Sequence, residues 1–259
     1  ILDKIVNAKK LRLDELKKTF SLDEIKQKAT SLENKPSSFR DSLLSSNQSI
    51  IAEIKQASPS AGIIDNNFDP ERQAIHYENI GATAISVLTE EDFFLGSAEH
   101  LQKVKQKSSL PILRKDFIIH EYQIYEARIL DADCILLIAS ILNDDQIAHF
   151  IDVARSLNLD CLMEVHDQDE LNRIESIKDV IIGVNNRNLK TFEVDISLSV
   201  KLKNSYRGDN PFVAESGIKS QEDLDSLMNN GIKNFLIGES LMKEKNLTMA
   251  TKNILGIKN

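Results

Sequence analysis

Short apolar segments rich in Ile, Val and Leu alternate with longer polar segments along most of the chain. Eight apolar segments occur, at residues 50–55, 82–89, 111–116, 133–139, 160–165, 180–184, 211–215 and 234–238. Several of them are apolar at consecutive positions, which is typical of parallel strands that are covered on both faces. We therefore interpret each segment as a buried β-strand.

The segments between these strands carry helix signals. Asp69 and Pro70 have the order of an N-cap followed by proline in the first turn. Asp167 and Glu170 have the spacing of a capping box. The helix after the sixth strand, at about residues 197–203, has the weakest pattern. A strand followed by a helix, repeated eight times, predicts an α/β fold of the closed (β/α)8 or TIM barrel type.

Residues 1–48 precede the first predicted strand and contain scattered apolar positions. These positions suit two amphipathic helices packed outside the barrel, and they include Leu11, Leu16, Phe20, Leu22 and Ile25. We expect an N-terminal helical extension over residues 1–48 and a catalytic barrel over 49–259, forming one domain overall. The 259 residues agree with the roughly 250 that are typical of one such barrel.

Composition narrows the function classes. The chain has 32 basic and 40 acidic residues, a net charge of −8, and no basic run, which argues against nucleic-acid binding. No apolar run is long enough to span a bilayer, and residues 1–16 lack the apolar stretch of a signal peptide. We expect a cytoplasmic monomer that contacts no membrane.

The two cysteines, Cys134 and Cys161, both lie within apolar segments. In a cytoplasmic chain this placement indicates buried, reduced thiols rather than a disulfide. The cysteine and histidine positions show no zinc-binding pattern, so we expect no metal site.

Polar side chains interrupt the apolar strands near their carboxyl ends, where barrels of this kind carry their active sites. These side chains are Glu53, Lys55, Lys115, Glu164, Asn185 and Glu215. Ionisable groups are costly to bury unless they are paired. A single pair would be equally consistent with a structural ion pair, but six such positions predict a common active site.

The loops after the seventh and eighth strands are the usual phosphate-binding loops of such barrels. Here they contain Ser216 and Gly217, and Gly238, Glu239 and Ser240. Glycine lets backbone N–H groups approach an anion closely, and a following helix N-terminus favours negative charge. These loops therefore predict a phosphate site.

Seven motifs in order along the chain resemble those of the indole-3-glycerol phosphate synthase family. They read IAEIKQASPSAG at 51–62, AISVLTEEDFFLGS at 84–97, PILRKDFIIHEYQIYEAR at 111–128, MEVHDQDEL at 163–171, IIGVNNRNLKTFEVD at 181–195, VAESGI at 213–218 and FLIGESLM at 235–242. The resemblance extends from the first residues to at least Met242. It departs mildly from the family pattern at His120, where an acidic residue is common, and at Ala214, where serine is common.

The resemblance implies that Lys115 is the general acid and Glu164 the general base. It also carries over the remaining polar site positions Glu53, Lys55, Ser58, Ser60, Asn185, Arg187, Glu215, Ser216 and Gly217. The implied substrate is the sugar phosphate 1-(2-carboxyphenylamino)-1-deoxyribulose 5-phosphate. The implied reaction closes the indole ring with loss of carbon dioxide and water.

The chemistry of ring closure assigns tasks to these groups. Attack on the ketone needs a proton donor at its oxygen, a role suited to the Lys115 ammonium. Dehydration needs a base near the ring N–H, for which we choose Glu164, and an acid at the departing hydroxyl, either Lys115 or Lys55. Glu215 and Asn185 are expected to orient substrate hydroxyls and the lysines. No step requires a metal or a redox cofactor.

Other residues are assigned to substrate binding. Lys55 and Arg187 would balance the phosphate and the carboxylate, and Ser58 and Ser60 lie in a loop that either closes over the substrate or is simply solvated. The ring of the substrate would fit a slot, or else simply a packed core, formed by Phe94, Phe117, Leu136 and Leu189. His166 follows Glu164 closely, and we expect it to be a solvated loop residue.

Three other functions remain open from the residues alone. Phosphoribosylanthranilate isomerase would need a cysteine at the end of the first strand, where neither Cys134 nor Cys161 lies. A Schiff-base aldolase would use a buried lysine such as Lys115, and borohydride trapping with a keto-sugar phosphate would reveal it. A barrel that binds phosphate without catalysis would show tight binding and no turnover.

Overall fold

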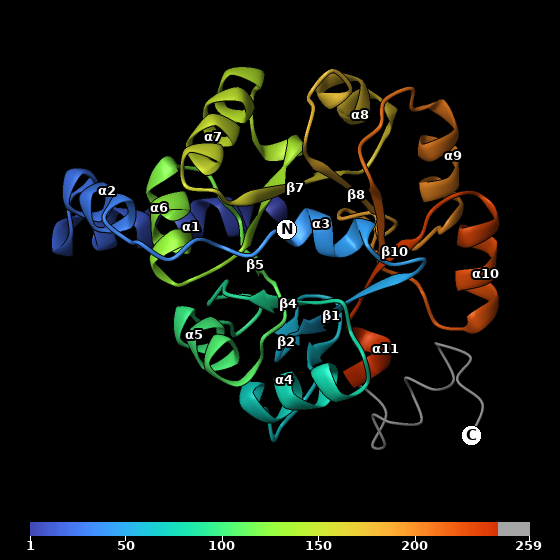
Figure 1. The fold of residues 1–259 in the computed structure, drawn as a ribbon, viewed down its shortest axis with the longest axis horizontal. Coiled ribbons are helices and arrows are strands. Elements are labelled where there is room, and N and C mark those ends of the chain that lie inside the picture. Colours follow the sequence, from blue (N-terminus) through green and yellow to red (C-terminus); the bar gives the residue numbers. More distant parts are fainter. Residues whose placement is uncertain (243–259) are drawn as a thin grey trace.

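A computed structural model describes residues 1–242, apart from the side chains of Ser240 and Met242. In this part of the chain eight parallel strands form a closed barrel in the order β1-β10-β9-β8-β7-β6-β5-β4. Helices follow the strands and surround the barrel as an outer ring (Figure 1). The predicted TIM barrel is therefore confirmed, including the helix after the sixth barrel strand.

The barrel strands are β1 (Ser49–Ile54), β4 (Ala84–Leu88), β5 (Ile112–Lys115), β6 (Cys134–Ile138), β7 (Asp160–Val165), β8 (Ile181–Asn185), β9 (Phe212–Glu215) and β10 (Asn234–Ile237). The helices of the barrel are α4 (Pro70–Asn79), α5 (Ala98–Lys107), α6 (Glu121–Ile129), α7 (Asp144–Ser156), α8 (Gln168–Ile174), α9 (Ser197–Ser205), α10 (Gln221–Asn229) and α11 (Glu239–Met242). A short 3-10 helix, η1 (Ala139–Ile141), links β6 to α7. Every predicted strand segment overlaps one barrel strand, and the bounds differ by up to two residues.

The strands are buried on both faces because successive side chains point alternately inward and outward. Ile51 and Leu113 belong to a cluster inside the barrel, whereas their neighbours Ala52 and Ile112 pack in the cluster beneath the helices. This double burial explains why the strand segments are apolar at consecutive positions.

The N-terminal extension differs from the prediction in number of helices and in which face is buried. It forms three helices, α1 (Leu2–Thr19), α2 (Leu22–Thr30) and α3 (Phe39–Leu44). The buried residues of α1 are Ile5, Lys9 and Leu13, spaced by four. Leu11 and Phe20, which we expected to pack, are 69% and 54% exposed. Leu16 is exposed as well, whereas Ile25 is buried and Leu22 packs against the core, as predicted.

The helix α3 closes the amino-terminal end of the barrel. Phe39 and Leu43 are fully buried in the cluster inside the barrel. The backbone N–H of Arg40 donates to the Asp160 carboxylate at 2.9 Å, at the start of β7. The helix α3 therefore seals the amino-terminal end of the barrel.

A buried ion pair joins α1 to the opposite, carboxyl end of the barrel. The Nζ atom of Lys9 lies 2.8 Å from Asp116 Oδ1, just beyond β5, and 2.9 Å from Glu91 Oε2, beyond β4. Asp116 also lies 3.2 Å from Arg114. Burial would raise the pKa of Asp116, but Lys9 and Arg114 outweigh it and lower that pKa to about 2. The carboxylate is thus held ionised beside Lys115, the last residue of β5.

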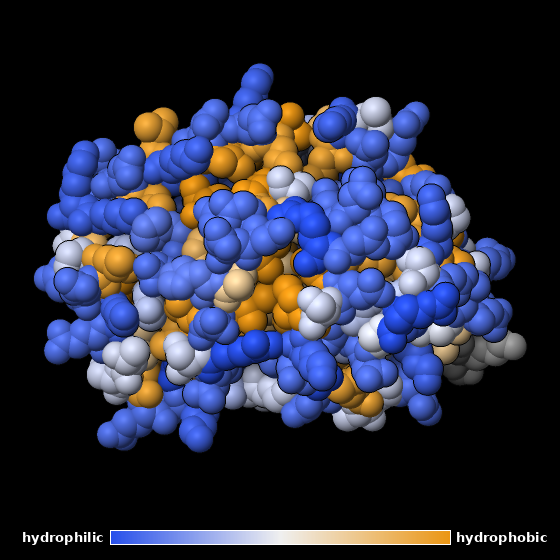
Figure 2. Space-filling model, turned by 90° about the horizontal axis from the view of Figure 1, so that it is seen from above, coloured by the Kyte–Doolittle hydropathy of each residue, from blue (hydrophilic) through white to orange (hydrophobic). Residues whose placement is uncertain are grey.

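The outer surface is mainly hydrophilic on the side seen in Figure 2, with apolar side chains visible between the charged ones. These apolar side chains gather near the middle of the view (Figure 2), and apolar atoms make up a large part of the surface of folded proteins in general. Within residues 1–242, the helices all fall short of the length and apolar character needed to cross a membrane.

Replacing Lys9 by methionine tests whether this ion pair stabilises the fold. Lys9→Met is expected to lower the free energy of unfolding by about 3 kcal/mol. The reason is that Asp116 stays buried and loses one of the two cations, Lys9 and Arg114, that compensate its negative charge. The measurement is urea denaturation at neutral pH. The matched control is Lys10→Met on the exposed face of the same helix, which should change stability by less than about 0.5 kcal/mol. Equal losses in the two variants would contradict the role given to Lys9.

Candidate active site

A cavity of about 700 Å3 opens at the carboxyl ends of the barrel strands. It is lined by all of the site residues predicted from the sequence except Ser240, namely Glu53, Lys55, Ser58, Ser60, Phe94, Lys115, Phe117, Leu136, Glu164, Asn185, Arg187, Leu189, Glu215, Ser216, Gly217, Gly238 and Glu239. Ser240 belongs to α11, but its side chain lies outside the described part of the structure. The strand ends thus bring together residues that are far apart in the sequence.

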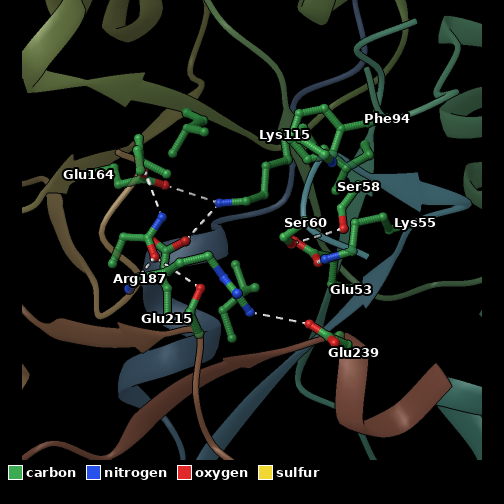
Figure 3. Close-up of a pocket in the computed structure, with 18 of the residues that line it drawn as sticks. Glu53, Lys55, Ser58, Ser60, Phe94, Lys115, Glu164, Arg187, Glu215 and Glu239 are labelled. Carbon is green, nitrogen blue, oxygen red and sulfur yellow. Dashed lines mark hydrogen bonds and ion pairs between the residues drawn. The ribbon is translucent and has the colours of Figure 1, made fainter. Parts of the chain in front are cut away.

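Lys115 lies at the centre of the polar cluster (Figure 3). Its Nζ atom is 2.7 Å from Glu215 Oε2 and 3.2 Å from Glu164 Oε2. Burial alone would lower the pKa of this ammonium, but Glu215, Glu164 and the nearby Glu53 raise it above its ordinary value. Lys115 is therefore a buried cation that stays charged as long as these carboxylates are ionised.

Glu164, from β7, is held from several sides. Its Oε2 pairs with Lys115, and its Oε1 accepts a hydrogen bond from Asn185 Nδ2 at 3.2 Å. Oε1 also lies 3.2 Å from Nε2 of His166. Burial would raise the pKa of Glu164, yet Lys115, His166 and Asn185 together hold it below its ordinary value. The group is therefore ionised and fixed in place.

Glu215, from β9, has a different environment although it shares Lys115 with Glu164. Its Oε1 atom is buried and has no hydrogen-bond partner within residues 1–242. Burial and repulsion from Glu164 raise the pKa of Glu215 to about 7, against the opposing effect of Lys115. The two carboxylates thus differ in proton affinity, and such a separation is typical of acid–base sites.

A mid-strand glycine makes room for Glu215. A Cβ atom built on Gly183 would overlap Glu215 Oε1 and the side chain of Leu162. Gly183 lies in β8, next to β9, where a side chain would point into the space that the carboxylate occupies. The position of Glu215 relative to Lys115 therefore depends on a neighbour without a side chain.

The other side of the cavity carries Glu53 and Lys55, which form an ion pair (Figure 3). The loop after β1 is a hairpin, with the short strands β2 (Ala57–Ser58) and β3 (Gly62–Ile63), which the sequence did not predict. The hydroxyl groups of Ser58 and Ser60 lie 3.3 Å apart in this hairpin. The loop is therefore partly ordered by its own hydrogen bonds.

Arg187 and two phenylalanines line the outer part of the cavity. Arg187 Nη2 lies 3.2 Å from Glu239 Oε2, between the loops after β8 and β10. The rings of Phe94 and Phe117 have centroids 6.0 Å apart and are tilted by 36°. The Phe94 backbone N–H donates to the buried carboxylate of Glu90 at 3.0 Å, which fixes the loop that carries the ring.

Sequence reasoning missed several contributions to this site, including Phe192 and Val194 in the loop after β8 and Lys219 in the loop after β9. Ile1, Leu2 and Ile5 of the N-terminal extension line the cavity, and no periodic signal indicated that they would reach it. His166 lies in the loop after β7 as expected, but the expectation that it is solvated was wrong: only 15% of its side chain is exposed, and it ion-pairs with Glu164 and Glu170. Its position two residues after Glu164 was the available signal, since alternate residues of an extended segment share a face.

The predicted capping box at the start of α8 is also only half formed, and this concerns the same histidine. Asp167 accepts from the N–H of Glu170 at 2.9 Å, as an N-cap should. The Glu170 carboxylate instead accepts from the backbone N–H of His166 at 2.8 Å. Glu170 is therefore engaged with His166 rather than with the N-cap residue.

Both cysteines are free and buried, in β6 and β7, away from the end of β1. Burial raises the pKa of Cys161 to about 12 and that of Cys134 well above its ordinary value, so both are unreactive thiols. Within residues 1–242, His, Cys, Asp and Glu side chains form no group of three or more that could hold a metal ion.

The family model that matches this chain and two of its most similar relatives carry the same family name. The family model for indole-3-glycerol phosphate synthase matches residues 2–254. A protein of that name from Ruminiclostridium cellulolyticum is 47% identical over 244 residues, covering 94% of both chains. Another from Endomicrobium trichonymphae is 46% identical over 250 residues, covering 95% of this chain and 96% of the relative.

Solved structures with low sequence identity share the fold. A tryptophan synthase α-subunit from Pyrococcus furiosus aligns with a TM-score of 0.61 at 18% identity, over 81% of this chain and 98% of the other. The N-acetylmannosamine-6-phosphate 2-epimerase from Clostridium perfringens aligns with a TM-score of 0.60 at 16% identity, over 81% and 93%. These likenesses concern the barrel only.

The dependence of Glu215 on Gly183 can be tested by structure determination. Gly183→Ala is expected to displace the Glu215 carboxylate, so that its distance from Lys115 Nζ exceeds 2.7 Å, and to destabilise the fold by about 1 to 3 kcal/mol. The control is Gly208→Ala, whose new methyl group would meet the ring of Tyr206 instead. It should leave the Lys115–Glu215 pair in place. An unmoved Glu215 in Gly183→Ala would refute this explanation.

Proposed function

The chain belongs to the indole-3-glycerol phosphate synthase family, and on that premise we propose which side chains carry each step of the reaction. It is a carboxy-lyase of tryptophan biosynthesis that forms indole-3-glycerol phosphate from 1-(2-carboxyphenylamino)-1-deoxyribulose 5-phosphate. The reaction joins an aromatic carbon to the ketone carbon, releases carbon dioxide and then releases water. The attack on the ketone and the loss of water each need a proton to be delivered to an oxygen atom, namely the ketone oxygen and the departing hydroxyl.

Lys115 is the acid of the first event. Negative charge develops on the ketone oxygen as the ring carbon attacks, and a charged donor in a buried site stabilises it most. The ammonium of Lys115 lines the cavity, 2.7 Å from Glu215 and 3.2 Å from Glu164. The observation that carries the proposal is this one ammonium bridging two carboxylates at the base of the cavity.

Glu164 is the base of the dehydration, and its proton affinity changes during the reaction. In the resting site Lys115, with His166 and Asn185, keeps the pKa of Glu164 low, which makes it a weak base. Once Lys115 has given its proton to the substrate, one of the two cations in contact with Glu164 is lost, and the proton affinity of Glu164 rises. The first proton transfer therefore prepares the base for the second.

The acid at the departing hydroxyl is one of two ammonium groups. Lys115 can serve again after it has taken up a proton from water, and Lys55, which is paired with Glu53, lines the same cavity. Glu215 and Asn185 contact Lys115 and Glu164, respectively, and are suited to orient both groups and the substrate hydroxyls.

The substrate anions bind at the open side of the cavity. The loops containing Ser216 and Gly217, and Gly238 to Ser240, offer backbone N–H groups to the phosphate. Arg187 would exchange Glu239 for a substrate oxygen, since its pair at 3.2 Å lies at the edge of the cavity. Lys55, with the hydroxyl groups of the hairpin after β1, supplies further polar contacts.

The aromatic part of the substrate fits the apolar side. Phe94 and Phe117 lie with their ring centroids 6.0 Å apart, and Leu136 and Leu189 line the same cavity. An anthranilate ring buried there would gain about 25 cal/mol for each Å2 of apolar surface removed from water. We assign these four side chains to ring binding.

At the level of the whole molecule, the proposal describes a cytoplasmic monomer that acts on a small sugar phosphate without nucleic acid or membrane partners. We propose that residues 1–48 and 49–259 together form one catalytic domain, of which residues 243–259 lie outside the described part of the chain. The buried contact between Lys9 and Asp116 supports a single domain, because it joins the N-terminal extension to the strand end that carries Lys115. Metal and redox cofactors have no task in the steps assigned above.

Two substitutions test the assignment of acid and base. Lys115→Ala and Glu164→Gln are each expected to lower turnover by at least about 100-fold, because each removes a proton-transfer group. Both variants should still bind the substrate. The assay follows the fluorescence of the indole product, and substrate binding is measured separately by calorimetry.

The matched control is Lys103→Ala, which removes a lysine paired with Glu99 at 2.7 Å on the surface of α5. It should turn over at the normal rate. Near-normal activity of Lys115→Ala would refute the proposed mechanism, and a borohydride-trapped adduct on Lys115 would show that the lysine acts as a nucleophile instead.

A further inference from the structure

His166 lies just beyond β7 and places its imidazole between two carboxylates. Its Nε2 atom is 3.2 Å from Glu164 Oε1, and its Nδ1 atom is 3.2 Å from Glu170 Oε2. Its side chain is 15% exposed, and it does not line the cavity. The imidazole is therefore close to the proposed base without facing the space for the substrate.

We propose that His166 is a positioning residue for the reaction, whose imidazolium fixes the Glu164 carboxylate and keeps it ionised until it accepts the proton of the dehydration step. The inference rests on the proposed role of Glu164 as the base. His166 itself touches no reacting atom, and it acts through Glu164.

The contacts of Glu164 explain why a second cation is needed. Oε2 faces Lys115, and Oε1 faces both Asn185 and His166, each at 3.2 Å. Asn185 is neutral, so Lys115 and His166 are the cations in contact with Glu164 in the described structure. When Lys115 transfers its proton to the substrate, His166 is the one that remains charged.

Without the positive charge of His166, Glu164 would not remain ionised and able to accept a proton. Glu215 lies on the other side of Lys115 and repels Glu164. With Lys115 neutral, two buried carboxylates would face each other, and one of them would take up a proton, as like charges in one site do. A fixed imidazolium beside Glu164 makes Glu215 the group that is protonated.

The second carboxylate, Glu170, keeps the imidazole charged and oriented. Burial would lower the pKa of His166, but Glu164 and Glu170 outweigh it and raise that pKa to about 10. The Glu170 carboxylate also accepts from the His166 backbone N–H at 2.8 Å. Since Glu170 lies in the first turn of α8, this helix fixes the direction of the ring.

Charged and polar groups from four other elements of the barrel determine the pH dependence. Lys115 comes from β5, Asn185 from β8, Glu215 from β9 and Glu170 from α8. His166 favours the ionised form of Glu164, so its removal raises the pKa of Glu164. The acid limb of the kcat profile should then move to higher pH, because the base is lost by protonation earlier.

The test substitutes His166→Gln, which keeps a polar side chain and removes the charge. We expect kcat to fall about tenfold or more, because the base is less well placed, while KM changes little. The acid limb of the kcat profile should shift upward. Glu170→Gln should produce the same shift to a smaller extent, and it remains informative if His166→Gln does not fold.

The control is His149→Gln, which removes an exposed imidazole 3.4 Å from Glu121 and should leave the profile unchanged. An acid limb that stays at the wild-type pH in both His166→Gln and Glu170→Gln would overturn this inference, even if kcat is lower. Glu164→Gln, measured beside them, separates the two proposals. If it keeps its turnover, the base assignment itself has failed; if it is inactive while His166→Gln behaves as wild type, only the role of His166 has failed.

Discussion

The ammonium group of Lys115 lies in a buried site between the carboxylates of Glu164 and Glu215, at 3.2 and 2.7 Å. Charges in such a place are tolerated only because they compensate each other. The closed parallel barrel makes this possible, since the carboxyl ends of strands β5, β7 and β9 meet at one end of the fold. The same ends leave a cavity of about 700 Å3 above the cluster.

Supporting contacts keep the cluster in one arrangement. Gly183 leaves space for Glu215, and Nε2 of His166 lies 3.2 Å from Glu164 Oε1. Lys9 pairs with Asp116, the residue that follows Lys115. Each of these contacts comes from a different element. The chemistry of the site therefore depends on packing around the barrel and on the N-terminal extension as well as on the groups that face the substrate.

Much of the fold could be predicted from the sequence, because strands that are buried on both faces are apolar at consecutive positions. The strand ends could be predicted for the same reason: a charged residue such as Lys115 or Glu164 stands out in an apolar strand. These arguments gave the barrel and the six polar residues at the strand ends, whereas Ser58, Ser60 and Arg187 followed from the family resemblance.

Other features depend on which way a side chain or a helix face points in the folded chain, and the order of residue types does not specify this. Leu11 and Phe20 are apolar yet exposed, because α1 buries the face that contains Ile5 and Leu13. His166 was expected in solvent because, although its spacing from Glu164 indicated a shared face, the contact of Glu170 with its ring does not follow from the sequence. The effect of Gly183 likewise depends on a neighbouring strand that is distant in sequence.

The account rests on the unequal proton affinities of two carboxylates that share one ammonium. Carbon-13 NMR titration of the glutamate side chains, with Glu215→Gln used for assignment, measures these affinities directly. The account predicts that Glu215 titrates at about pH 7, while Glu164 stays ionised below the ordinary glutamate value of about 4.3. If both groups titrate together near that ordinary value, the shared ammonium does not control the site and the account is contradicted.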